Sequence, residues 1–232
     1  MKTIGLIGGM SWESTAIYYS KINRMVRARL GGNSSGKILL HSLNFAEIEA
    51  LQLASEWTRC GEILTESASI LKQGGADCIL ICANTMHKVA ESVQESIAVP
   101  LIHIGRATGL AIRSSGLKKV GLLATQYTME EPFLKQIITE SSGAVILVPP
   151  AEDRPEIHRI IYQELTQGTF STESKMKYLS AIDDLRERGA QGIIFGCTEI
   201  GLLLERRDLK MPFFDTADLH AQAAVDFALE RK

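Results

Sequence analysis

Cys197 is the residue whose type and surroundings point most directly to proton chemistry. It lies in residues 189–199 (GAQGIIFGCTE), which match residues 75–85 (GADCILICANT) at a constant offset of 114. This register pairs Cys197 with Ala83, so one copy carries a thiol and the other carries a methyl group. A thiolate can remove a proton from carbon and a thiol can return one, whereas Ala83 can do neither.

The two paired positions predict a site for handling a proton from two sides. If each segment is a strand leading into a helix, positions 83 and 197 lie at strand carboxyl ends, where open α/β sheets bind ligands. Facing walls of one cleft would then serve both faces of a planar carbanion, which is the geometry of a racemase or epimerase. We expect a helix start to lower the pKa of the Cys197 thiol from about 8.5. The alternative is an inert buried cysteine.

Short polar side chains follow the same strand ends and are suited to binding a carboxylate. Asn84, Thr85 and Thr198 offer donors beside helix starts, whose backbone N–H groups favour anions. Thr125 ends another repeated strand, where it is expected to contact the ligand, to cap a helix, or to do both. Glu199 either orients the thiol or caps its helix, and we favour capping.

The sequence indicates no metal and no cofactor. Its five histidines have no metal-ligand spacing, and His87 is expected to pack rather than to act as a base. Gly8 and Gly9 follow the first strand without a dinucleotide or phosphate-loop pattern, and we expect them to allow close approach of a small anion.

Strands and helices alternate along the chain and must position these residues. Residues 3–9 resemble 119–125, and 100–104 resemble 212–216, with stretches of helical apolar spacing between them. Short, continuous apolar strands are typical of a parallel sheet that is covered on both faces. We predict an α/β fold of two pseudo-symmetric doubly wound lobes, with the site in the cleft between them. The N-terminal lobe is expected to contain residues 1–104 plus 217–232, and the C-terminal lobe residues 105–216.

Composition favours small-molecule chemistry. The 232 residues are 45% hydrophobic and 22% charged, which is sufficient for a core. With a net charge of −2, the chain has no overall positive charge that would attract nucleic acid or an anionic membrane. No apolar run reaches membrane-spanning length and no signal-peptide pattern is found, so we expect a cytoplasmic protein with four reduced cysteines.

Three motifs together resemble the aspartate/glutamate racemase family across essentially the whole chain. They are residues 5–15 (GLIGGMSWEST), 82–87 (CANTMH) and 195–200 (FGCTEI). The resemblance implies a pyridoxal-independent two-base racemase of acidic or more varied amino acids, usually a homodimer. It also implies two sets of substrate-binding residues: Met10, Gln52 and Gln163 near the ligand side chain, and Asn84, Thr85 and Thr198 on its α-carboxylate.

Ala83 departs from the pattern of that family. In family members the residue before Asn84 is an acid/base group, a cysteine or, in one enteric bacterial subgroup, a threonine. We hypothesise an impaired form, arising naturally or by an engineered change that traps a bound amino acid. Cys82 is a poor substitute because adjacent strand residues point to opposite faces. Two alternatives are a decarboxylase or isomerase with a single cleft cysteine, and an amino-acid-binding module without catalysis.

Overall fold

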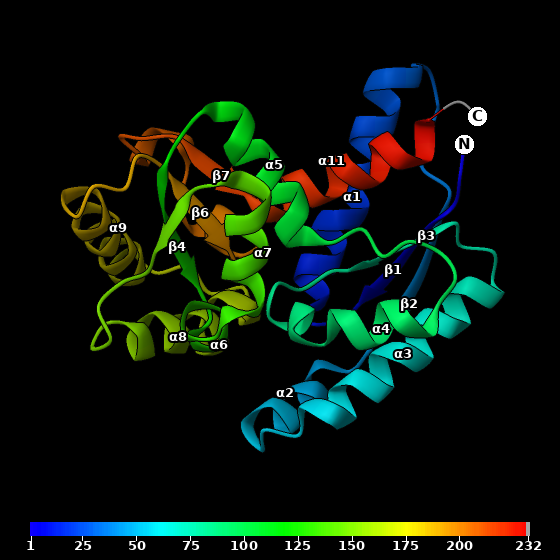
Figure 1. Ribbon diagram of the computed structural model, residues 1–232, viewed down its shortest axis with the longest axis horizontal. Coiled ribbons are helices and arrows are strands. Elements are labelled where there is room, and N and C mark those ends of the chain that lie inside the picture. Colours follow the sequence, from blue (N-terminus) through cyan, green and yellow to red (C-terminus); the bar gives the residue numbers. More distant parts are fainter. Residues whose placement is uncertain (231–232) are drawn as a thin grey trace. The chain divides into compact units, whose positions relative to one another are not determined.

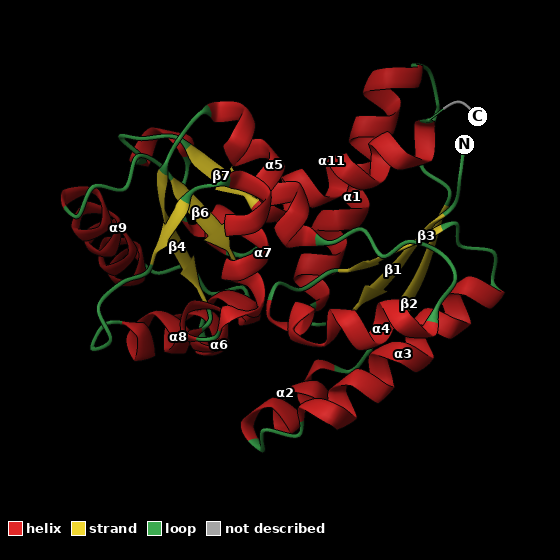
Figure 2. Ribbon diagram, viewed as in Figure 1, coloured by secondary structure: helices red, strands yellow, loops and turns green. Residues whose placement is uncertain are grey.

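A computed structural model describes residues 1–230 of the chain, which divides into two compact units (Figure 1). The N-terminal unit combines Met1–Ile104 with the residues from His220 onward, and the C-terminal unit comprises Gly105–Leu219. Each unit contains one parallel sheet flanked by helices (Figure 2), so the predicted α/β fold with a repeated architecture is confirmed.

The sheet of the N-terminal unit has the strand order β2-β1-β3, with both pairs parallel. Its strands are β1 (Ile4–Gly8), β2 (Ile38–Ser42) and β3 (Cys78–Ile81). All residues of β1 and β3 are buried, as a sheet covered on both faces requires. Leu101 adds an isolated parallel bridge to Ile79 at the edge.

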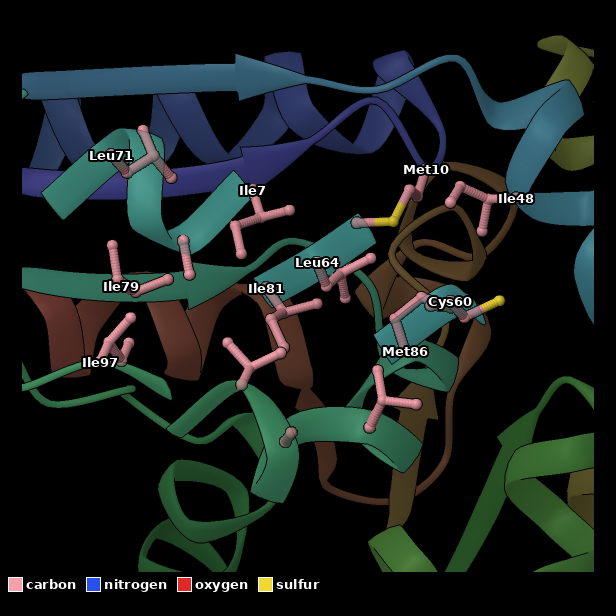
Figure 3. Close-up of a cluster of buried hydrophobic side chains, with 14 of the residues drawn as sticks. Ile7, Met10, Ile48, Cys60, Leu64, Leu71, Ile79, Ile81, Met86 and Ile97 are labelled. Carbon is pink, nitrogen blue, oxygen red and sulfur yellow. The ribbon is translucent and has the colours of Figure 1, made fainter. Parts of the chain in front are cut away.

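Helices cover this sheet and enclose an apolar core. The helices are α1 (Trp12–Leu30), α2 (Phe45–Leu53), α3 (Trp57–Gln73), the 3₁₀ helix η1 (Thr85–Val89) and α4 (Ala90–Ser96). Side chains at helical spacing on α3, including Leu64 and Leu71, meet Ile79 and Ile81 of β3 in this core (Figure 3). Burial of this continuous apolar surface fixes β3, and with it the chain that leads to position 83.

The C-terminal unit repeats the arrangement with the strand order β5-β4-β6-β7, again all parallel. Its strands are β4 (Lys119–Ala124), β5 (Val145–Leu147), β6 (Ile193–Gly196) and β7 (Phe213–Asp215). The remaining helices are α5 (Ile104–Ser115), α6 (Gln126–Glu130), α7 (Pro132–Ser142), α8 (Arg154–Gln163), η2 (Leu165–Gln167), α9 (Thr172–Glu187), α10 (Ile200–Leu203), η3 (Arg206–Asp208) and α11 (Thr216–Leu229).

The repeat extends to individual hydrogen bonds. Ile79 N donates to Pro100 O at 3.0 Å, and Ile193 N donates to Pro212 O at 2.9 Å. These are the residues that the sequence repeat aligns. β3 and β6 are therefore each joined in the same way to the segment that follows on their outer side.

Equivalent glycines let β1 and β4 approach the neighbouring strand. A Cβ on Gly5 would lie 2.7 Å from Ile79 Cδ1, and a Cβ on Gly121 would lie 2.7 Å from Ile193 Cδ1. Both distances are shorter than carbon atoms tolerate, so each unit needs a residue without a side chain at this point.

The C-terminal part of α11 packs in the N-terminal unit. Lys2 N donates to Ala228 O at 2.9 Å, and Arg29 Nη2 lies 2.5 Å from Asp226 Oδ1. Among residues 1–230, no helix has the length and apolar character needed to cross a membrane.

Candidate active site

Cys197 directly follows β6 and lies at the start of a polar turn. Its side chain is partly exposed, whereas Cys60, Cys78 and Cys82 are buried. The Sγ atom donates a hydrogen bond to Glu199 Oε2 at 2.9 Å. Thr198 Oγ1 donates to the same oxygen, also at 2.9 Å. One carboxylate oxygen thus fixes the thiol and the hydroxyl together.

Glu199 has a different role from the one we favoured. The residue occupies the N-cap position of α10 and is only 2% exposed, but its side chain caps no backbone N–H. The prediction of helix capping is therefore wrong. The carboxylate instead accepts bonds from the Cys197 thiol and the Thr198 hydroxyl, and bonds to an ionised acceptor are stronger than those between neutral groups.

The prediction of a lowered pKa at Cys197 is also wrong. Burial raises the pKa of the Cys197 thiol well above its usual value, and the charge and the hydrogen bond of Glu199 raise it further. Backbone bonds at Glu199 and Thr198 lower the pKa but are smaller causes. A buried thiol beside a carboxylate favours its protonated form, which is the form that donates to Glu199.

Position 83 is partly exposed two residues beyond the end of β3. Its neighbour Cys82 is fully buried one residue beyond the end of β3, and burial raises the pKa of the Cys82 thiol. Cys82 therefore presents no accessible thiol beside Ala83. The N-terminal unit therefore has an apolar methyl at the position where the C-terminal unit has a thiol.

The predicted binding residues of the N-terminal unit are buried around the turn after β3. Asn84 and Thr85 begin the 3₁₀ helix η1, so the expected α-helix start is a tighter turn here. Gln52 Nε2 donates to Met86 Sδ at 3.0 Å, and Met10 packs in the same core cluster as Met86 (Figure 3). Met10 and Gln52 are thus both linked to the turn that carries Thr85.

The predicted binding residues of the C-terminal unit differ in burial: Thr125 is buried and Gln163 is exposed. Thr125 is the N-cap of α6, and its Oγ1 accepts from Thr128 N at 3.4 Å, which bears out the capping alternative. Gln163 is exposed at the end of α8, where its Oε1 accepts from Arg159 Nη1 at 3.4 Å. The ligand contacts of both residues stay predictions.

Sequence reasoning undervalued Glu199 and His87. Glu199 is two residues from Cys197, and His87 is one helical turn beyond Ala83, to whose carbonyl its Nδ1 lies at 2.9 Å. The short sequence distances of Glu199 from Cys197 and of His87 from Ala83 are the signals by which the sequence could have indicated these contacts. Within residues 1–230, no group of three or more His, Cys, Asp and Glu side chains is arranged to hold a metal ion.

Two repeated parallel α/β units, with the Cys197 thiol at one strand end, are the arrangement of the two-lobed racemase folds. A Yersinia pestis protein assigned as a candidate Asp/Glu racemase is 48% identical, with a TM-score of 0.91 over 99% of this chain and 100% of that one. An aspartate racemase homologue from Pyrococcus horikoshii is 34% identical, with a TM-score of 0.85 over the same shares. The broad specificity amino-acid racemase RacX of Bacillus subtilis is 20% identical over 96% of each chain.

The family model for Asp/Glu/Hydantoin racemases matches residues 7–224. The chain belongs to the Asp/Glu/Hydantoin racemase family, as its three motifs predict.

Proposed function

We propose that this chain is built as a pyridoxal-independent racemase of acidic amino acids, aspartate or glutamate, and that Ala83 impairs it. The observation that carries the proposal is the Cys197 thiol bound to Glu199 at 2.9 Å, at a strand end whose counterpart in the repeat is position 83. Family membership supports the reaction class, and the names of the relatives at 48% and 34% identity support acidic substrates.

In this proposal Cys197 exchanges a proton with one face of the substrate Cα. Its thiol donates to a carbanion, and its thiolate removes the Cα proton in the reverse direction. The raised pKa of Cys197 makes the thiolate scarce near neutral pH. Deprotonation by Cys197 should therefore quicken as the pH rises.

The residue at position 83 serves the opposite face of Cα. A threonine or cysteine there has a proton to move, whereas the methyl group of Ala83 has none. Inversion needs both faces, but exchange of the Cα proton with solvent needs only one. We therefore propose that the chain retains slow exchange for one enantiomer and almost no inversion.

Substrate binding is assigned to short polar groups and amides. Asn84, Thr85 and Thr198 hold the α-carboxylate and stabilise the charge that spreads onto it when the Cα proton leaves. Thr125, directly after β4, is a further hydroxyl at a strand end. The side-chain carboxylate of the substrate contacts Met10, Gln52 and Gln163, where amide N–H groups donate to it.

Calorimetry and isotope exchange test the proposal on the chain as it stands. Both enantiomers of aspartate and glutamate are titrated, and Cα deuterium incorporation from D₂O is followed between pH 7 and 10. We expect binding, exchange of one enantiomer that rises with pH, and no exchange in Cys197→Ser. Absence of binding, or equal exchange and inversion, would contradict the proposal.

The family resemblance also leads us to propose a homodimer. Sedimentation equilibrium of the full chain should give twice the 25.5 kDa of one chain. A single-chain mass at all concentrations would refute this part alone.

A further inference from the structure

Three histidines from distant parts of the sequence gather in the N-terminal unit. His87 lies in η1, His103 directly precedes α5, and His220 lies in α11. The ring centroid of His87 is 4.6 Å from that of His103 and 5.6 Å from that of His220. His87 is 3% exposed and His220 is fully buried, so neither ring has more than slight contact with water.

The two hydrogen bonds of His87 define its proton position. Ile104 N donates to His87 Nε2 at 3.2 Å, so that nitrogen carries a lone pair. The proton is then on Nδ1, which donates to Ala83 O at 2.9 Å. One neutral ring thus joins the carbonyl at position 83 to the first residue of α5.

His220 is fixed in the opposite tautomer. Its Nε2 lies 2.5 Å from Ile102 O, which can only accept, so this nitrogen carries the proton. Its Nδ1 accepts from Tyr18 Oη at 2.8 Å. The bond to Ile102 holds the segment from which Ile104 reaches His87.

The two connections between the units pass through this cluster. The chain leaves the N-terminal unit after Ile104 and re-enters it at His220. His87 bonds to the first of these residues, and the second is itself a member of the cluster. The carbonyl at position 83 is therefore bonded to a ring that also contacts both connecting segments.

We propose that His87 is a positioning residue for position 83: through its Nδ1–H it fixes the peptide that carries the second acid/base side chain. His87 acts on the backbone carbonyl, so the contact is made whichever side chain occupies position 83. An error of about 1 Å in the position of a catalytic group can cost roughly 100-fold in rate, which is why such an anchor matters. The proposal rests on the proposed function only for its kinetic readout.

The surroundings of the cluster support a neutral ring. Burial lowers the pKa of His87 well below its usual value, and the neighbouring His103 and His220 lower it further. The rings of His103, before α5, and of His220, in α11, face His87, and the backbone of Ala83 and Ile104 contacts its two nitrogens. Tyr18 of α1 bonds to His220. None of these groups carries a negative charge that would favour the imidazolium form of His87.

The kinetic test uses two substitutions in an Ala83→Thr background. His87→Phe removes the donor, whereas His87→Asn keeps an amide N–H near the place of Nδ1. We expect His87→Phe to lower inversion by roughly 10- to 100-fold and His87→Asn to restore most of it. His41→Phe, on β2 outside the cluster, is the matched control and should leave inversion unchanged.

A second readout separates positioning from damage to the fold. In the chain with Ala83, His87→Phe should leave the Cys197-dependent Cα exchange within about twofold, because that step does not use position 83. Equal losses of inversion and exchange, or no rescue by His87→Asn, would overturn the proposal. If Ala83→Thr itself shows no inversion, the proposed function fails instead.

NMR of the full chain tests the contact without activity. Nitrogen-15 imidazole shifts should report His87 as neutral with its proton on Nδ1, and His220 as neutral with its proton on Nε2, from pH 5.5 to 8. A charged His87, or a proton on its Nε2, would overturn the inference even if every variant fails to fold.

Discussion

At the scale of single residues, the proposed chemistry depends on the hydrogen bond between the Cys197 thiol and the Glu199 carboxylate. Cys197 donates to Glu199 Oε2 at 2.9 Å, and the carboxylate raises the pKa of the thiol. A helix start acts in the opposite direction, but α10 is only one short turn. The charge of Glu199 and burial together outweigh it.

Removal of that charge should make the thiol more acidic. In Glu199→Gln the repulsion between thiolate and carboxylate disappears, so we expect the pH midpoint of Cys197 alkylation by iodoacetamide to fall by about one unit or more. Cys197 is the suitable reporter because Cys60, Cys78 and Cys82 are buried. Mass spectrometry of the alkylated peptide measures the rate at each pH.

The control removes the charge of a glutamate that is exposed and distant in sequence from Cys197. Glu187, at the end of α9, is exposed, and Glu187→Gln should leave the alkylation midpoint in place. An unchanged midpoint in Glu199→Gln would mean that the carboxylate does not control the thiol.

At the scale of elements, the repeated sheets depend on close packing at equivalent points. Gly5 and Gly121 sit on β1 and β4, each against an isoleucine of the neighbouring strand. An added methyl group must displace a buried side chain, because both sites lack free space.

Alanine at either glycine should therefore destabilise the fold by similar amounts. We expect Gly5→Ala and Gly121→Ala each to lower the free energy of unfolding by about 1 to 3 kcal/mol. Urea denaturation followed by circular dichroism measures the change.

Gly201→Ala is a suitable control, since Gly201 is an exposed helical residue whose added Cβ would lie 3.3 Å from Asp215 Oδ2. Its effect should stay within about 1 kcal/mol and could be stabilising. A large effect at one strand glycine and none at the other would argue that the repeat does not extend to packing.

The elements were largely predictable from sequence, because three pairs of segments repeat in the same order and align strands whose hydrogen bonds also correspond. Local spacing could not predict that η1 is a 3₁₀ turn or that Glu199 bonds to the thiol rather than capping α10. The first is set by the backbone conformation after the strand and the second by a side-chain rotamer. Neither hydrophobic periodicity nor helix propensity specifies them.

At the scale of the whole molecule, the histidine cluster links folding to pH. The folded state holds His220 neutral, because burial lowers its pKa to about 3. Burial also lowers the pKa of His87. The unfolded chain binds protons at both residues near pH 6.5, so it gains stability relative to the folded state as the pH falls below that value.

We therefore expect the free energy of unfolding to decrease from pH 6.5 towards pH 4. Each of the two histidines contributes a slope of at most about 1.4 kcal/mol per pH unit. Urea titrations across this range should show a shallower slope in His220→Gln, by close to one proton. An identical slope in the variant would show that His220 does not contribute.

The clustering of His87, His103 and His220 was beyond sequence reasoning. These residues are separated by up to 133 positions in the sequence. The folded N-terminal unit brings the ring of His87 within 4.6 Å of His103 and 5.6 Å of His220, measured between ring centroids. No spacing rule connects a turn after β3 with α11. Scattered histidines without metal-ligand spacing therefore gave no signal of a shared role.

The most direct measurement of the central claim compares inversion by the present chain with inversion by Ala83→Thr and Ala83→Cys. Circular dichroism follows the conversion of each enantiomer of aspartate and glutamate. We predict that either substitution raises inversion by at least about 100-fold, since loss of one member of a catalytic pair costs several orders of magnitude, and that Cys197→Ser in the same background abolishes it. Unchanged inversion in both position-83 variants, with substrate still bound, would contradict the account.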